Sequence, residues 1–217
     1  MKKTIVIATI GSLALFVSHA HSALIEIAIE AEITGVSDSG NLLEGNVNVG
    51  DIITGSYRYD SETPDSSPID PIVGRYWCYS IPYGISLNVG DLLFQADPAS
   101  VEFLVLVVNN NSLGHDIYGV VSYNNHIVDK NLHVDSISFT LKDYSGQALI
   151  DDNLPILPPQ IEEYNDENYL VIAGGREGGY GISARVFSAV LIPEPSSIIL
   201  LTLGYLCIHN KKRKTMK

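Results

Sequence analysis

Cysteine is scarce in this chain of 217 residues, which contains only Cys78 and Cys207. Cys207 lies in a C-terminal apolar stretch, whereas Cys78 lies in the acidic middle of the chain. No disulfide can therefore form within the middle, and its fold must be stabilised by packing. Cys78 has no histidine or basic residue directly beside it, so we interpret it as a small buried hydrophobic residue rather than a nucleophile.

Basic residues are also few outside the two ends of the chain. The whole sequence holds 13 Lys and Arg against 25 Asp and Glu, a formal charge of −12. Seven of the basic residues lie near the termini, so positions 24–190 hold 6 basic and 24 acidic residues, a formal charge of −18. A field of this sign repels phosphate backbones and argues against a nucleic-acid partner. Cations, neutral sugars and basic surfaces remain compatible with it.

Motifs for catalysis and cofactor binding are missing as well. The chain has no nucleophile elbow, zinc-ligand spacing or phosphate-binding loop. We interpret His115, His126 and His133 as surface residues rather than metal ligands, because their spacing places no two on one helix or strand face. The glycine-rich residues 174–181 lack the Lys-Ser/Thr and the helix of a phosphate loop, and they predict a hairpin. We therefore expect no enzymatic activity and no cofactor, with a secreted glycoside hydrolase as the alternative.

The N-terminus has the features of a secretory signal peptide, which we predict over residues 1–23. Lys2 and Lys3 give it a positive start, and residues 5–17 form an uncharged apolar run. A helix over that run would be roughly 20 Å long, short of a ~30 Å hydrocarbon core, which favours a cleaved signal over an anchor. The small residues that follow allow a signal peptidase to cut after Ala20, Ser22 or Ala23. Export through the Sec machinery is the expected consequence.

The C-terminal residues 192–217 combine three features in a fixed order. Pro193, Glu194 and Pro195 come first, and an apolar helix is predicted over residues 198–208. A basic tail over 211–217 follows, and its cluster consists of Lys211, Lys212, Arg213 and Lys214. The prolines block helix continuation and keep the first segment extended, while the cluster holds the end of a short transmembrane helix in the cytoplasm.

This combination resembles the PEP-CTERM sorting signal, with all three parts present from Pro193 to about Lys214. The resemblance implies recognition by an exosortase, an integral membrane transpeptidase-like enzyme of Gram-negative bacteria that make exopolysaccharide. The chain would be membrane-anchored through residues 198–208 before processing. A plain tail anchor is the alternative interpretation.

The middle of the chain alternates apolar and polar residues in the manner of β-strands. Residues 24–33 place Ile25, Ile27 and Ile29 on one face and Glu26 and Glu30 on the other. The same reasoning predicts strands over residues 52–59, 74–81, 85–89, 92–95, 101–108, 117–123, 135–142, 169–173 and 182–191. Turn residues separate them, and no long helical period is present. We therefore predict one all-β domain over residues 24–191, an antiparallel β-sandwich or jelly roll, with residues 154–168 as a long surface loop.

Two short segments of this domain are similar to a set of uncharacterised PEP-CTERM proteins. Residues 49–66 contain the pattern Ile-Thr-Gly-x-Tyr-x-Tyr-Asp-Ser-x-Thr-Pro-Asp-Ser, and residues 153–159 contain a Leu-Pro and Pro-Pro element. The resemblance implies a shared β fold and export route, and it carries no catalytic residue.

An acidic, proline-containing loop over residues 60–70 is a candidate calcium site. It supplies four carboxylates, from Asp60, Glu62, Asp65 and Asp70. Carboxylate oxygens are preferred Ca²⁺ ligands, but the spacing matches no known calcium loop. A solvated loop is the alternative.

Aromatic residues gather between positions 57 and 83 and suggest a sugar-binding surface. Alternation places Tyr57 with Tyr59 on one face, and Trp77 with Tyr79 on the face opposite Tyr76 and Cys78. Tyr57, Tyr59, Trp77 and Tyr79 are therefore candidate glycan contacts. Core packing explains the same enrichment, because strands and cores both favour aromatic residues.

Together these patterns predict an exported protein of the cell surface or extracellular matrix, processed by exosortase and associated with exopolysaccharide. A carbohydrate-binding module, in a calcium-dependent form if the acidic loop holds the ion, is the second hypothesis. The secreted hydrolase is the third.

Overall fold

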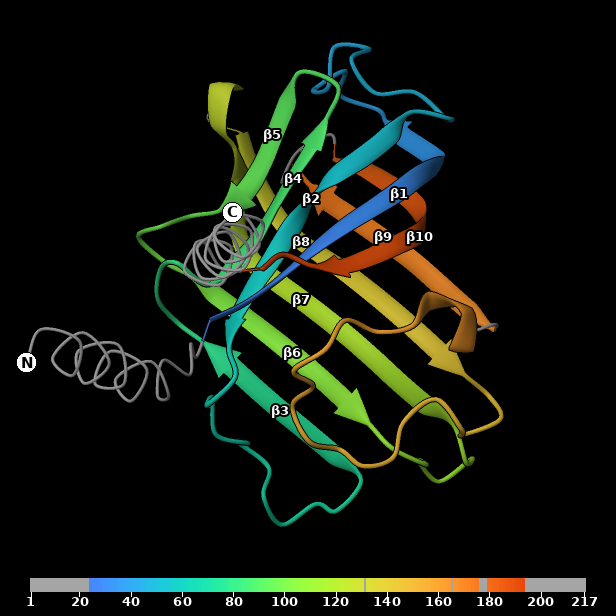
Figure 1. Cartoon of the computed structure of the whole chain (residues 1–217). Helices are drawn as coiled ribbons and strands as arrows, with labels where there is room; N and C mark the ends of the chain where they lie inside the picture. Colours follow the sequence, from blue (N-terminus) through green and yellow to red (C-terminus); the bar gives the residue numbers. More distant parts are fainter. Residues whose placement is uncertain (1–23, 131, 165, 176–178, 194–217) are drawn as a thin grey trace, which may run out of the picture.

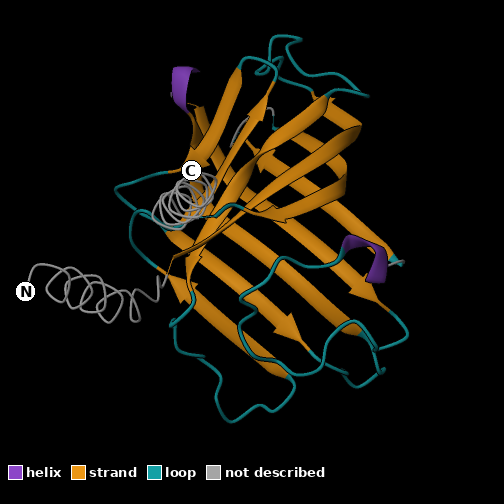
Figure 2. Cartoon of the chain, viewed as in Figure 1, coloured by secondary structure: helices purple, strands orange, loops and turns teal. Residues whose placement is uncertain are grey.

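The computed structural model describes residues 24–130, 132–164, 166–175 and 179–193, which form an all-β domain of ten strands and two short 3₁₀ helices (Figures 1 and 2). The strands are β1 (Leu24–Asp38), β2 (Ile52–Asp60), β3 (Val73–Cys78), β4 (Gly84–Val89), β5 (Leu92–Ala96), β6 (Glu102–Val108), β7 (Asp116–Ile127), β8 (Leu132–Asp143), β9 (Glu167–Gly174) and β10 (Tyr180–Leu191). The 3₁₀ helices are η1 (Val128–Lys130) and η2 (Ile161–Glu163). The prediction of an all-β domain is confirmed, and every strand expected from the alternating pattern is present.

Eight of the strands close into a barrel. Neighbouring strands pair antiparallel in the order β7–β5–β4–β2–β1–β10–β9–β8, and β8 pairs again with β7. Register shifts in β1, after Glu30 and after Ile33, and in β8 after Val134 mark irregularities of the kind that bend and twist a sheet. Closure removes the free edges of these eight strands.

The two remaining strands continue the sheet away from the barrel. The edge of β7 that faces away from β8 pairs with β6 over residues 117–123 and with β5 over residues 125–127. Strand β6 then pairs with β3, whose far edge is bounded by the loop that follows β2 (Figure 1). The branch β7–β6–β3 forms a twisted extension with an inner face toward the core and an outer face toward solvent.

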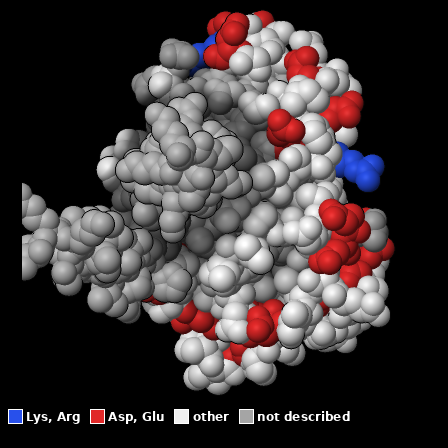
Figure 3. All heavy atoms as spheres, viewed as in Figure 1, with Lys and Arg blue, Asp and Glu red and all other residues white. Residues whose placement is uncertain are grey.

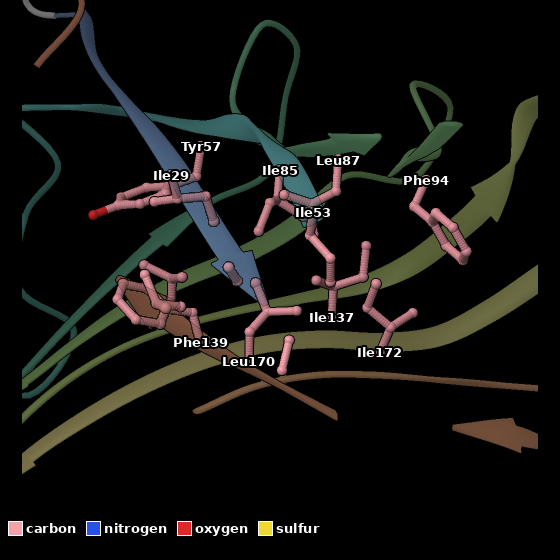
Figure 4. Packing of buried hydrophobic residues seen from close by; sticks show 14 of the residues in the cluster. Ile29, Ile53, Tyr57, Ile85, Leu87, Phe94, Ile137, Phe139, Leu170 and Ile172 are labelled. Atoms are coloured by element: carbon pink, nitrogen blue, oxygen red, sulfur yellow. The ribbon is translucent and has the colours of Figure 1, made fainter. Parts of the chain in front are cut away.

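A single hydrophobic core fills the barrel and the inner face of the branch. In Figure 4, Ile29 of β1 and Ile53 of β2 lie opposite Phe139 of β8 and Leu170 of β9, and all four are almost fully buried. Each fully buried aliphatic or aromatic side chain contributes about 1.5–3 kcal/mol. Cys78 is buried among them as a free thiol, as the sequence predicted.

The closed barrel differs from the sandwich or jelly roll that the strand pattern predicted. Both architectures bury one face of every strand, so alternation with a period of two cannot distinguish them. The difference depends on β7, which is long enough to pair with both β5 and β6 along one edge. Its other edge pairs with β8, so β7 joins β5 to β8 and closes the barrel. No local pattern in residues 116–127 encodes that double pairing.

The segments predicted to act as sorting signals lie mostly outside the described residues. These are the signal peptide over 1–23, Glu194, Pro195, the apolar helix over 198–208 and the tail over 211–217. Pro193 is described and follows directly on Ile192, whose N–H still donates to the Glu26 carbonyl at 2.8 Å. No helix within the described part of the chain is long and apolar enough to cross a membrane.

Candidate functional site

Three aromatic side chains form a row on the outer face of the branch, which we call the aromatic face: Trp77, Tyr79 and Tyr123. The Trp77 and Tyr79 rings lie 5.8 Å apart between centroids, with planes inclined by only 6°. The Tyr123 ring lies 6.4 Å from Trp77, inclined by 23°. Tyr79 is 66% exposed and Tyr123 is 38% exposed, so their rings are accessible from solvent.

Strand register explains how residues from distant parts of the sequence meet there. Trp77 of β3 pairs with Leu104 of β6, and Tyr123 of β7 pairs with Glu102 of β6. Tyr79 comes two residues after Trp77 and one after the end of β3, which places it beside Glu102 on the same face. Leu104 is only 8% exposed on this outer face, where it pairs with Trp77.

Polar side chains continue the aromatic face toward β8. Asn124 donates from Nδ2 to the Glu102 carboxylate at 3.2 Å. Across β7 and β8, Tyr123 pairs with Ser136, and Val121, two residues earlier on the same face, pairs with Ser138. Both serines are half-buried. With strands about 4.8 Å apart, the surface from β3 to β8 spans about 14 Å. Near-parallel rings beside hydroxyl, amide and carboxylate groups can stack on the apolar face of a sugar ring and bind its hydroxyls.

Tyr57 and Tyr59, by contrast, are completely buried in the core. Their rings stack at 6.1 Å, and the Tyr57 hydroxyl lies 2.9 Å from that of Tyr118. The Tyr59 hydroxyl donates to the Pro155 carbonyl at 2.6 Å. Burial raises the pKa of Tyr57 well above its ordinary value, so its hydroxyl stays protonated. These two tyrosines therefore belong to the core and not to a glycan-contacting surface.

Three of the four carboxylates of the acidic loop accept hydrogen bonds within the fold. Asp60 accepts from the Glu62 N–H and from the Tyr83 hydroxyl. Asp65 accepts from the Arg75 N–H at 2.8 Å and so caps the free edge of β3, while Asp70 accepts from the Ile72 N–H at 3.0 Å. Glu62 is exposed.

Within the described ranges, no three His, Cys, Asp or Glu side chains are arranged to hold a metal ion. His126 of β7 pairs with His133 of β8, so the strand register brings together two histidines that their spacing in the sequence did not place on one face. His133 also lies 3.2 Å from Asp135. His115 instead packs against the Tyr144 ring at 4.5 Å, away from both. A sequence signal existed for the first pair, because positions 126 and 133 flank one short hairpin.

Tyr123 was the functional candidate that sequence reasoning missed. It lies 44 positions after Tyr79, and only the pairing of β3 with β6 and of β6 with β7 places it next to Trp77.

Of the predicted sorting motif, the structure describes Pro193. Glu194, Pro195 and the basic cluster lie outside the described residues.

No protein-family model, no curated protein and no solved structure matches this chain.

Proposed function

We propose that this chain is an exported, non-catalytic protein of the cell surface or extracellular matrix, whose domain binds an uncharged polysaccharide through the aromatic face. The observation that carries the proposal is the row of near-parallel rings of Trp77, Tyr79 and Tyr123 on the outside of a sheet. Exposed tyrosine and tryptophan side chains provide large contact areas at a small entropic cost, which makes them effective anchors for a ligand.

The charge of the domain supports a neutral rather than an acidic polysaccharide. Figure 3 shows many acidic side chains and few basic ones on the face in view, in keeping with the charge of −18 over positions 24–190. An anionic polymer would be repelled by this field, and most strongly at low ionic strength. A neutral polymer is free to use stacking and hydrogen bonds.

The two ends of the chain support the cellular part of the proposal. The signal peptide over 1–23 would direct export, and the segment from Pro193 to Lys214 would be read by an exosortase. The protein would be held transiently in the inner membrane, then processed and released to the surface or matrix. Exopolysaccharide is the partner that both the sorting route and the aromatic face favour.

Affinity electrophoresis tests the binding proposal directly. The full chain is run through gels that contain a neutral polysaccharide or an acidic one, with and without EDTA. We expect retardation in at least one neutral gel, and none in alginate. Equal mobility in every gel would remove polysaccharide binding and leave the export proposal to be tested separately.

A further inference from the structure

A cavity lies at one end of the barrel, beneath the long loop between β8 and β9. Its volume is about 440 Å³, within the range of pockets that bind small organic molecules. Tyr118 of β7 lines it, and the remaining lining residues come from positions 148–164 of the loop. Mouths of β-barrels are recurrent places for such sites.

Hydrogen bonds to the barrel hold the loop over this cavity. The Tyr76 hydroxyl donates to the Asp152 carbonyl at 2.8 Å, and the Tyr59 hydroxyl donates to the Pro155 carbonyl. The Leu149 N–H donates to the buried Asp116 carboxylate at 2.8 Å. Because three contacts from different strands tie the loop down, the cavity is formed before a ligand arrives, which lowers the ordering cost of binding.

The walls of the cavity are largely apolar, and the apolar surface extends outward. Leu149 and Leu154 are half-buried in it, while Ile156 and Leu157 line it and remain 62% and 64% exposed. Ile150 of the same loop is 97% exposed. A run of exposed aliphatic side chains around the opening of a pocket is unusual on a soluble surface and marks a place that an apolar molecule covers.

The Tyr164 side chain brings a hydroxyl group to the lining of the cavity. Only 4% of the Tyr164 surface is exposed, and its hydroxyl makes no hydrogen bond to another described residue. The hydroxyl oxygen is not among the buried unpaired polar atoms of the described residues, so it is accessible to solvent. Burial raises its pKa, as do the nearby Asp116, Glu163 and Asp143 carboxylates, so the hydroxyl remains a neutral donor. The same carboxylates disfavour an anionic ligand.

We propose that this cavity binds a neutral amphiphilic small molecule, whose apolar chain lies between Leu149, Leu154 and Leu157. A carbonyl, ester or hydroxyl oxygen of the ligand accepts a hydrogen bond from Tyr164. A monoacylglycerol has this chemistry, whereas a free fatty acid presents a carboxylate. The site shares no residue with the aromatic face, so the test of this proposal is independent of the test of polysaccharide binding.

Titration with the neutral dye Nile red tests the site, with monoolein and oleate as competitors for the dye. We expect a saturable rise in fluorescence with the full chain, and displacement by monoolein at far lower concentration than by oleate. Tyr164→Phe should weaken dye binding about three- to tenfold, the range for one lost hydrogen bond. Tyr169→Phe, which removes a hydroxyl from an exposed tyrosine of β9, is the matched control and should change nothing.

Leu154→Trp provides a second, steric test, because the larger side chain fills the cavity. Loss of saturable binding at an unchanged melting temperature supports the site, and if this variant unfolds then Tyr164→Phe decides alone. Non-saturable dye binding, equal displacement by oleate, or unchanged affinity in Tyr164→Phe would overturn the proposal.

Discussion

Asp116 and Asp143 face each other across β7 and β8, and both are buried at the end of the barrel. Two carboxylates directly opposite one another would normally repel. Here backbone N–H groups surround them: Asp116 accepts from Asn110 and Leu149, and Asp143 accepts from Gln147 and Ala148 as well as from Ser145. The pair therefore anchors the start of the long loop that covers the cavity.

Replacing Asp143 by asparagine should lower the free energy of unfolding by about 2 kcal/mol at pH 7, the usual loss for hydrogen bonds to a charged group. Burial raises the pKa of Asp143. The N–H groups of Gln147, Ser145 and Ala148 and the Ser145 hydroxyl together lower it by a larger amount, so the folded pKa lies below its ordinary value. A lowered folded pKa gives stability that is present above the unfolded pKa of about 3.9 and is lost as pH falls through the folded value.

The check is urea unfolding of both proteins at pH 7 and at about pH 2.5. The difference between them should shrink at the acidic pH. Asp91→Asn, at an exposed turn, is the control, and its free energy of unfolding should equal that of the parent at both pH values. A difference of the same size at both pH values would contradict a charge-based anchor.

Gly74 is a second anchor point of the loop, because no side chain fits there. A Cβ at this position would lie 2.2 Å from the Asp152 carbonyl oxygen and 2.7 Å from the Tyr76 ring. Gly74→Ala should therefore destabilise the domain by about 1–3 kcal/mol and increase proteolytic cleavage in residues 150–160. Gly181→Ala is the matched control, since nothing lies within 4 Å of its Cβ in β10. Equal melting temperatures of the two variants would mean that the loop is not held against β3.

Much of this fold was readable from alternation alone, because the strands bury one face each. The same rule correctly placed Trp77 and Tyr79 on the face opposite Tyr76 and Cys78, although it did not say which of the two faces is buried. What it could not supply was pairing between strands far apart in the sequence. Barrel closure depends on residues 125–127 meeting β5, and only long-range register brings Tyr123 into the aromatic face.

The acidic loop shows a different limit of sequence reasoning. A carboxylate in a loop can bind a cation, face water or accept backbone N–H groups, and composition does not distinguish these uses. The structure assigns Asp65 to the edge of β3 through the Arg75 N–H, and Asp60 to its own turn. Their positions follow from the course of the chain between β2 and β3 rather than from their spacing.

Calcium should therefore stabilise the domain no more than sodium does at matched ionic strength. A site occupied at a hundredfold excess over Kd would add about 2.7 kcal/mol, a shift easily seen in a melting curve. Screening of the acidic surface alone raises stability slightly with either salt. A calcium-specific rise that disappears in Asp65→Asn would restore the metal site and the calcium-dependent form of glycan binding.

The sorting proposal predicts a defect in maturation without a defect in folding. Replacement of Pro193, Glu194 and Pro195 by alanine should leave an unprocessed precursor in the membrane fraction of the native host, since these residues follow the last strand. Pulse-chase labelling with fractionation measures this. Alanine replacement of Ser196 and Ser197, just beyond the motif, is the control and should mature normally. A Pro-Glu-Pro variant that matured and left the membrane at the parental rate would contradict the proposal.

The most direct test of the central claim is affinity electrophoresis of Tyr79→Ala and Trp77→Ala in the neutral polysaccharide gel that retards the parent chain. Loss of one central aromatic anchor should weaken binding about 30-fold, while the melting temperature of Tyr79→Ala stays unchanged because that ring is 66% exposed. Phe187→Ala removes a ring of β10 that is 52% exposed and lies away from the aromatic face, and this variant should migrate like the parent. Parental retardation of folded Tyr79→Ala and Trp77→Ala would contradict glycan binding at the aromatic face.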